Sequence, residues 1–196
     1  MATKRFGLNE NSLVVEVGSN DGTLLQFVKT PCYGIEPTAT GEKAKEKGIK
    51  TISKFFTETL AIELAEDGRA DLIVANNVLA HVPTLNDFCK GFTALLKDDG
   101  VAIFEFPHLL ATVQNNDFTQ MYSEHFSYLS LTAVQRIFKT NGLHIFDVEC
   151  LTTHGGSLRV YAQKAEGGLR DRSDFVRMVL NREEDAGVKT EKFYTD

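Results

Sequence analysis

The stretch VVEVGSNDGTLL, residues 14–25, decides the fold that we predict for this chain. An apolar run that includes Glu16 ends at Gly18, and after Ser-Asn-Asp the chain returns through Gly22 to apolar residues. A short apolar run that ends at glycine is typical of a buried strand. Glycine accepts backbone angles that other residues avoid and lets another group approach the main chain closely. The stretch therefore predicts either a tight turn alone or a turn against which a ligand lies.

Composition places the 196-residue chain among ordinary globular proteins, with 42% hydrophobic and 24% charged residues. The net charge of −6 argues against nucleic acid as the main partner, because a phosphate backbone attracts basic surfaces. We expect no membrane span, since no apolar run approaches the roughly 20 residues that a membrane helix needs. The N-terminal MATKRFGLNENS lacks the apolar stretch of a secretory signal. Three scattered cysteines without a CxxC pair predict reduced thiols in a cytoplasmic protein and no metal site.

Short apolar runs and helical patterns alternate along the first half of the chain. Strands are predicted at 13–18, 32–37, 48–52, 70–77 and 101–107, helices at 21–30, 38–47, 58–66 and 85–96, and a turn at 97–100. This alternation is typical of a parallel α/β sheet with helices on both faces. A helix at 131–140 and two alternating strands at 143–151 and 157–164 then predict an antiparallel pair at the end of a seven-stranded sheet.

Two segments depart from this pattern. Residues 108–130 are polar, aromatic and irregular, and a loop of this length inside a compact domain usually serves a function. Residues 166–196 begin with a glycine pair and continue as a charged helical pattern. We therefore expect a core domain over 1–165 and a helical extension over 166–196 that leads toward another part of a longer protein.

The polar residues of the opening stretch predict where a ligand would bind. In a parallel α/β sheet, ligands bind at the carboxyl ends of the strands, where Glu16 and Gly18 are expected to lie. Gly22 is expected to open the following helix, whose free amides would face the ligand. Glu36 ends the second strand about 20 residues after the turn, which is the spacing of a carboxylate that binds ribose hydroxyls.

The turn differs from the phosphate-binding loops of nucleotide-binding proteins. Ser19 and Asn20 stand where a GxGxxG fingerprint would need glycine, and no Gly-Lys-Ser/Thr follows. A pyrophosphate is therefore a poor fit, whereas a nucleoside with an uncharged or cationic extension fits better. A plain turn between strand and helix in another α/β protein is the alternative interpretation.

Three later stretches carry polar and aromatic side chains: ANNVLAHVP (75–83), MYSEHFSYLS (121–130) and THGGSLRVY (153–161). The residues of interest in them are Asn76, Asn77, His81, Tyr122, Glu124, His125, Tyr128, His154 and Arg159. The second stretch combines phenols, a carboxylate and an imidazole, the groups that proton transfer needs. The other interpretations are a packing role for His81 and an aromatic lid with a solvated Glu-His pair. For Arg159 the partner is either a phosphate or a buried acid.

The pattern ExGxxxG after a first strand, with an acid that ends the second, resembles the class I S-adenosylmethionine-dependent methyltransferases. Together, VEVGSNDGTLL, GIEP, ANNVLAHV, FEFPHL, YSEHFSYLS and THGGSLRVY closely resemble the sugar C-methyltransferases, which act on nucleotide-linked keto-deoxysugars. The resemblance implies a Rossmann-like class I fold, S-adenosyl-L-methionine as cofactor and a nucleotide-linked sugar as small-molecule substrate. It implies base-catalysed formation of an enolate, which then attacks the methyl group, and this chemistry requires no metal.

The resemblance also implies roles for individual residues. Cofactor contacts are expected from Glu16, Gly18, Asn20, Gly22, Glu36, Pro37, Asn76 and Phe56, with Phe55 and Phe56 either beside the adenine or in the core. The base is assigned to the Tyr122/His125 pair, with Glu124 orienting it or binding substrate. His81 is expected to face the enolate oxygen or to orient the substrate. Substrate contacts are expected from Asn77, Tyr128, His154 and Arg159.

The chain departs from the family at three places. Full-length members begin with a cysteine-rich zinc domain, which we do not find, and continue into a second α/β domain beyond the helix at which this sequence stops. Ser123 stands where the family often has histidine. The alternatives are O- or N-methylation of another small molecule, or a non-catalytic cofactor-binding module of a larger assembly. The sequence leaves the oligomeric state open.

Overall fold

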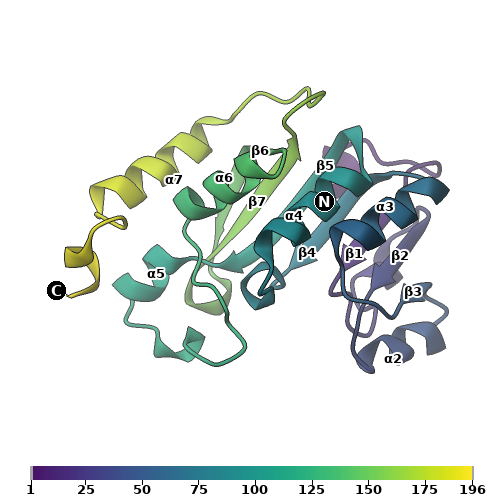
Figure 1. The fold of residues 1–196 in the computed structure, drawn as a ribbon, viewed down its shortest axis with the longest axis horizontal. Helices are drawn as coiled ribbons and strands as arrows, with labels where there is room; N and C mark the ends of the chain where they lie inside the picture. Colours follow the sequence, from purple (N-terminus) through teal and green to yellow (C-terminus); the bar gives the residue numbers. More distant parts are fainter. Residues whose placement is uncertain (1, 196) are drawn as a thin grey trace.

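The computed structural model describes residues 2–195, which form a seven-stranded sheet in the order β3-β2-β1-β4-β5-β7-β6 (Figure 1). The strands are β1 Val14–Val17, β2 Cys32–Ile35, β3 Thr51–Ile52, β4 Ala70–Asn76, β5 Leu96–Pro107, β6 Leu143–Leu151 and β7 Ser157–Lys164. Strands β1 to β5 pair in parallel, and β7 runs antiparallel to both of its neighbours, β5 and β6. The predicted mostly parallel sheet with an antiparallel terminal strand is confirmed.

The helices are α1 Ala2–Arg5, α2 Thr40–Glu46, α3 Glu58–Asp67, α4 Leu85–Leu95, α5 Leu109–Gln114, α6 Leu131–Thr140 and α7 Asp174–Asp185. Short 3₁₀ turns lie at η1 Leu25–Phe27, η2 Leu79–His81, η3 Phe118–Gln120, η4 Thr153–Gly155 and η5 Glu191–Tyr194. The Thr57 side chain caps α3 by accepting from the Leu60 amide, and Ser130 caps α6 by accepting from the Ala133 amide. None of the helices in residues 2–195 is long and apolar enough to cross a membrane.

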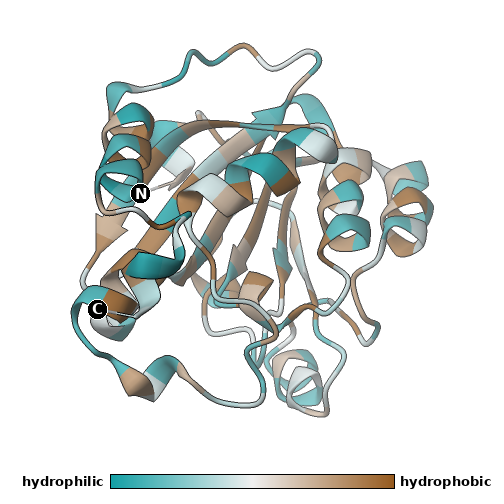
Figure 2. Ribbon diagram, turned by 60° about the vertical axis from the view of Figure 1, so that its left-hand side comes forward, coloured by the Kyte–Doolittle hydropathy of each residue, from teal (hydrophilic) through white to brown (hydrophobic). Residues whose placement is uncertain are grey.

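The main core lies between one face of the sheet and helices α3, α4 and α6. The rings of Phe92 on α4, Phe104 on β5 and Phe138 on α6 are fully buried and stack with centroid separations of 4.4 and 4.6 Å. Helix α7 packs against α6 and β6, and its Val176 is fully buried in the same core. Figure 2 shows the result, with predominantly hydrophobic strands and helices that carry a polar side outward.

The opposite face of the sheet is covered thinly. Val14, Leu72 and Ile103 on this face form a small cluster, against which residues of the N-terminal segment and Val28 pack, with a cavity of about 310 Å³ beside them. The helix predicted over 21–30 is wrong, because this stretch forms only the single turn η1. Asp21 holds a local turn by accepting from the Thr23 amide, and the chain is extended again at Val28, so too few residues are left for a helix.

Two other expectations need correction. The turn predicted at 97–100 lies within β5, where the pairing with β4 shifts register between Ala70 and Leu72 as in a β-bulge. The 108–130 segment is not irregular throughout, because it contains α5 and η3. The helix at 131–140 and the strands at 143–151 and 157–164 have the predicted bounds.

Candidate active site

The parallel strands bring the predicted site residues to the carboxyl edge of the sheet. Glu16 lies near the end of β1, Glu36 directly follows β2, and Asn76 ends β4. The turn after β4 continues through Asn77 to His81. Because β4 lies between β1 and β5, this turn lies between the carboxyl ends of β1 and β5. The site therefore has two halves, a glycine turn on one side and the 108–130 segment on the other.

The glycine turn uses its amides within the fold. The amides of Gly18 and Ser19 donate to the Ile35 carbonyl, and the Gly22 amide donates to the Ser19 carbonyl. The expectation that Gly22 opens a helix with free amides is therefore wrong. The Glu36 carboxylate, which is buried, accepts from the Asn20 amide at 3.0 Å and from the Thr38 amide at 2.9 Å. These bonds fix the end of β2 against the turn.

Gly18 and Gly22 are required by packing as well as by backbone angles. Gly18 has φ +70°, and a Cβ there would lie 2.5 Å from Cγ2 of Val78. Gly22 has φ +75°, and a Cβ there would lie 2.4 Å from Cδ1 of Ile49. Only glycine fits these positions without displacing a neighbour. Through Val78, the glycine turn is in contact with the turn that carries Asn77 and His81.

Glu16 carries the clearest sign of a missing partner in this half of the site. Its side chain is 6% exposed, and its Oε2 has no hydrogen-bond partner within the protein. Burial, together with the nearby charge of Asp21, raises the pKa of Glu16 to about 7. A buried carboxylate with a free oxygen suits a cationic group, which would hold it ionised. The buried end of β1 therefore suits a ligand that carries a positively charged group.

Asn77 is strained and incompletely bonded. Its φ of 54° is unusual for a residue with a side chain, although asparagine tolerates it better than most. Its amide donates to the Glu105 carbonyl at 2.7 Å, whereas its Oδ1 is buried without a partner. Strained residues with unsatisfied polar atoms concentrate at functional sites. Asn77 thus has the properties expected of a ligand contact.

Tyr122 and His125 form a hydrogen-bonded pair in the 108–130 segment. The Tyr122 hydroxyl lies 2.9 Å from Nε2 of His125, and Nδ1 of His125 lies 2.8 Å from the Gln120 carbonyl oxygen. A carbonyl only accepts, so Nδ1 carries the proton and Nε2 accepts from the hydroxyl. His125 is 9% exposed and Tyr122 is 44% exposed. The imidazole is therefore held inside while the phenol reaches the surface.

His81 completes the cluster from the turn after β4. Its ring centroid lies 4.7 Å from that of His125 and 6.2 Å from that of Tyr122. Burial, followed by the neighbouring His125, lowers the pKa of His81 and so favours the neutral imidazole. The amides of Phe126 and Ser127 donate to the Ala80 carbonyl, which ties the 108–130 segment to this turn.

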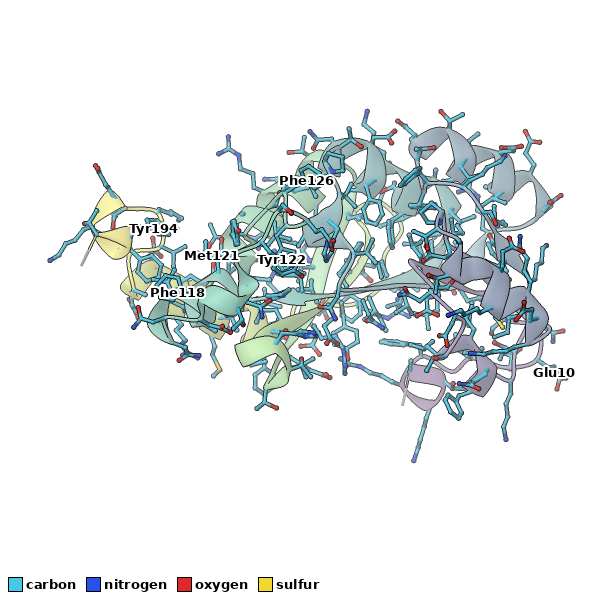
Figure 3. The ribbon with its side chains drawn as sticks, turned by 90° about the horizontal axis from the view of Figure 1, so that it is seen from below. Glu10, Phe118, Met121, Tyr122, Phe126 and Tyr194 are labelled. Carbon is cyan, nitrogen blue, oxygen red and sulfur yellow. The ribbon has the colours of Figure 1, made fainter. Side chains whose placement is uncertain are left out.

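Figure 3 shows Phe118 and Met121 toward the end of the molecule that carries Tyr194, and Tyr122 and Phe126, which belong to the same segment, nearer its middle. The side chains of Phe118, Met121, Tyr122 and Phe126 are all exposed. Glu124 is exposed as well, and Tyr128, 43% exposed, has its ring centroid 6.2 Å from that of His125. Within MYSEHFSYLS, the two tyrosine rings thus lie next to His125, whereas Met121, Glu124 and Phe126 are exposed.

Two predicted substrate contacts lie outside this cluster. Arg159 pairs with the buried Glu105 at 2.8 Å and with Glu149 at 3.4 Å, so a buried acid is its partner within the fold. His154 is exposed, and its loop contacts the stretch around Asn115, whose side-chain amide donates to the Gly155 carbonyl. The role of both side chains in substrate binding stays a prediction.

Phe56 belongs to the core and not to the glycine turn. It is 7% exposed, and its ring meets those of Phe88 and Phe92 edge-on at centroid distances of 5.6 and 5.2 Å. Its neighbour Phe55 is 78% exposed. The structure therefore favours the ordinary packing role for Phe56 and leaves Phe55 accessible to a ligand.

Sequence reasoning missed three contributors to this region. Gln120 and Ala80 act through their backbone carbonyls, for which no side-chain pattern gives a signal. His108, within FEFPHL, is buried and contacts Glu183 of α7, 75 residues later in the chain. The sequence indicated only a charged helical pattern around Glu183. Within residues 2–195, no group of three or more His, Cys, Asp or Glu side chains is arranged to hold a metal ion.

Comparison with known proteins identifies the family of this chain. Residues 2–148 match the methyltransferase domain family, and residues 152–196 match the C-methyltransferase C-terminal domain. The curated C-methyltransferase NovU of Streptomyces niveus is 33% identical over 201 residues, which cover 100% of this chain and 48% of that protein. This chain thus spans about half the length of the curated relative that it matches.

Solved structures share the fold at low sequence identity. An S-adenosylmethionine-dependent methyltransferase from Clostridium acetobutylicum is 13% identical with a TM-score of 0.64, over 83% of this chain and 87% of that one. Magnesium protoporphyrin IX methyltransferase from Synechocystis, solved with bound SAH, is 17% identical with a TM-score of 0.61, over 83% of this chain and 78% of that one. By its sequence match over residues 2–148, the chain belongs to the methyltransferase domain family.

Proposed function

We propose that this chain is an S-adenosylmethionine-dependent C-methyltransferase that methylates the carbon beside the keto group of a nucleotide-linked sugar. The observation that carries the proposal is the Tyr122–His125 pair, oriented by the Gln120 carbonyl and flanked by His81. The match to the C-methyltransferase C-terminal domain and the resemblance to NovU support methylation at carbon.

The cofactor half of the site would be formed by the glycine turn and the ends of β2 and β4. Glu16 has the free buried oxygen that suits the cofactor's ammonium group, and we assign Glu36, directly after β2, to the ribose. Asn20, Pro37, Asn76 and the exposed Phe55 complete the set that we assign to cofactor binding. When bound, S-adenosylmethionine supplies an electrophilic methyl group. Neighbours of the same fold that bind SAM or SAH support this assignment.

Carbon becomes a nucleophile only after a proton next to a carbonyl has been removed, so the protein must supply a base. Nε2 of His125 carries the lone pair and can take the proton of the Tyr122 hydroxyl, which makes the phenol oxygen basic. That oxygen then removes the proton from the substrate carbon. The neutral His81 can donate a hydrogen bond to the enolate oxygen that forms.

The enolate step is tested without methyl transfer. A nucleotide-linked keto sugar is incubated in D₂O with the chain and the demethylated cofactor, and NMR follows the loss of the proton next to the keto group. We expect wild type to exchange this proton, and both His125→Asn and Tyr122→Phe to abolish exchange and methyl transfer while cofactor binding stays intact. Methyl transfer to an oxygen or nitrogen acceptor by both variants at the wild-type rate would contradict the proposal, because such acceptors do not need this base.

A further inference from the structure

The two ends of the 108–130 segment lie side by side. His108, which follows β5, forms an isolated parallel bridge with Leu129, and the Leu109 amide donates to the Leu129 carbonyl at 2.9 Å. Helix α6 begins directly afterwards, at Leu131. The segment that carries Tyr122 and His125 is therefore a loop closed at its base, and whatever holds the base sets the direction in which the loop leaves the sheet.

One carboxylate holds both ends of this loop. Glu183 on α7 is 1% exposed, and its Oε1 lies 2.7 Å from Nε2 of His108 and 2.6 Å from the Leu131 amide nitrogen. Its Oε2 accepts from the Thr132 amide at 2.8 Å. A single side chain from the C-terminal helix thus contacts the residue before the loop and the helix after it.

The contact also explains why a charge can be buried here. The first amides of an α-helix have no partner within the helix, and its N-terminus attracts negative charge. Ser130 satisfies the Ala133 amide of α6, and Glu183 satisfies those of Leu131 and Thr132. Burial alone would raise the pKa of Glu183, but hydrogen bonds from His108 and the α6 amides outweigh it and keep the pKa below its usual value. The carboxylate therefore remains ionised and fully bonded.

We infer that Glu183 is a positioning residue, which fixes the base of the 108–130 segment and thereby the orientation of the Tyr122–His125 pair. Leu129 lies four residues from His125, and between them the amides of Phe126 and Ser127 bond to the Ala80 carbonyl beside His81. A shift at Leu129 must move these bonds. The inference rests on the proposed function only in taking the Tyr122–His125 pair as the proton-transfer group.

The test compares two neighbouring glutamates of α7 in the full chain. Glu183→Gln removes the buried carboxylate, whereas Glu184→Gln changes an exposed neighbour whose carboxylate lies 4.0 Å from the Lys189 ammonium. Hydrogen exchange followed by NMR reports on the Phe126 and Ser127 amides, and the ¹⁵N shift of Nε2 reports on the His125–Tyr122 hydrogen bond. We expect Glu183→Gln to accelerate exchange of the two amides by about tenfold and to shift the His125 signal. Glu184→Gln should leave both unchanged.

Two substitutions at His108 provide a second, independent test of the contact with Glu183. His108→Leu removes the donor to Glu183, whereas His108→Gln retains an N–H that can donate. We expect His108→Leu to reproduce the changes of Glu183→Gln and His108→Gln to restore most of the wild-type behaviour. If Glu183→Gln does not fold, the two His108 variants test the inference by the same measurements, amide exchange at Phe126 and Ser127 and the ¹⁵N shift of His125.

Two results would overturn the inference. One is wild-type exchange at Phe126 and Ser127, with an unchanged His125 signal, in the folded Glu183→Gln or His108→Leu variant. The other is faster exchange by the same factor in β1 and β4, which would mean a general loss of stability. None of these measurements needs a substrate, so failure of the wild-type chain to methylate a keto sugar would refute the proposed function and leave this test intact. Where methylation is observed, Glu183→Gln should lower kcat without weakening cofactor binding.

Discussion

The hydroxyl oxygen of Tyr122 lies 2.9 Å from Nε2 of His125, and the opposite nitrogen of that imidazole faces the Gln120 carbonyl at 2.8 Å. The backbone carbonyl thus selects the tautomer in which Nε2 is free to accept a proton. His81 stands beside the same imidazole with a centroid separation of 4.7 Å. Two segments that are separate in the chain therefore meet in one cluster of ionisable rings.

The pKa of His81 provides the first prediction. Burial lowers it below the ordinary 6.5, and the neighbouring His125 lowers it further. In an NMR titration of the histidine ring protons, His81 should therefore titrate below pH 6.5 in wild type. In His125→Asn the midpoint should move upward, because the electrostatic effect of the neighbouring imidazole on His81 is removed while burial remains. An unchanged midpoint would show that His125 has no influence on His81.

The pH dependence of stability provides the second prediction. Glu16 has a pKa of about 7 in the folded chain against a reference of 4.5, so the folded state binds the proton more tightly than the unfolded state does. The stability contributed by the protonated carboxyl is fully present below pH 4.5 and is lost as the pH rises through about 7. The shift corresponds to about 3 kcal/mol at 1.36 kcal/mol per pKa unit.

Urea denaturation at pH 5 and pH 8 measures this contribution. In Glu16→Gln the free energy of unfolding should fall less between the two pH values than it does in wild type, because the substituted side chain does not ionise. Glu10→Gln, at an exposed position, is the matched control and should show the wild-type decrease. Equal decreases in wild type and Glu16→Gln would contradict the assignment.

The contact between Gly18 and Val78 provides the third prediction. Gly18→Ala places a methyl group 2.5 Å from Cγ2 of Val78 at a φ of +70°, and should lower the free energy of unfolding by about 2–5 kcal/mol. Gly48→Ala has a similar φ of +79° with no atom within 4 Å of the new methyl, and should cost only about 1–2 kcal/mol.

A double-mutant cycle separates the two causes. Val78→Ala removes the clashing methyl groups but leaves the backbone angle of Gly18 unchanged. In the Gly18→Ala background, Val78→Ala should therefore recover part of the lost free energy of unfolding. The remaining loss due to Gly18→Ala should be about that of Gly48→Ala. Additive losses in the double variant would show that Val78 does not account for the glycine requirement.

The neighbouring phenylalanines Phe55 and Phe56 provide the fourth prediction. Phe56→Ala should lower the free energy of unfolding by about 3–5 kcal/mol, because its ring is buried among Phe88 and Phe92. Phe55→Ala should change stability by no more than about 0.5 kcal/mol, since the side chain is 78% exposed. Calorimetry with S-adenosylmethionine should show weaker binding for Phe55→Ala. Unaltered affinity would remove Phe55 from the cofactor site.

Much of the fold could be predicted because local pattern and tertiary structure agree. The strands at 143–151 and 157–164 alternate apolar and polar residues, and the helix at 131–140 begins at the capping residue Ser130, so their bounds follow from the chain itself. The helix expected at 21–30 was wrong. Its apolar residues fit a helical face, but the turn at Asp21 and the extended chain at Val28 leave room only for the single turn η1.

The sequence by itself determined the sheet, the glycine turn and the identity of the groups that can transfer a proton, because these depend on periodicity, backbone freedom and side-chain chemistry. Only the tertiary structure decided which of these groups meet. It paired Arg159 with Glu105, buried Phe56 in the core, and brought Glu183 to His108 across 75 residues. Such contacts form because buried charges and helix ends need partners in the folded chain. The positions of these residues along the sequence do not indicate which of them will pair.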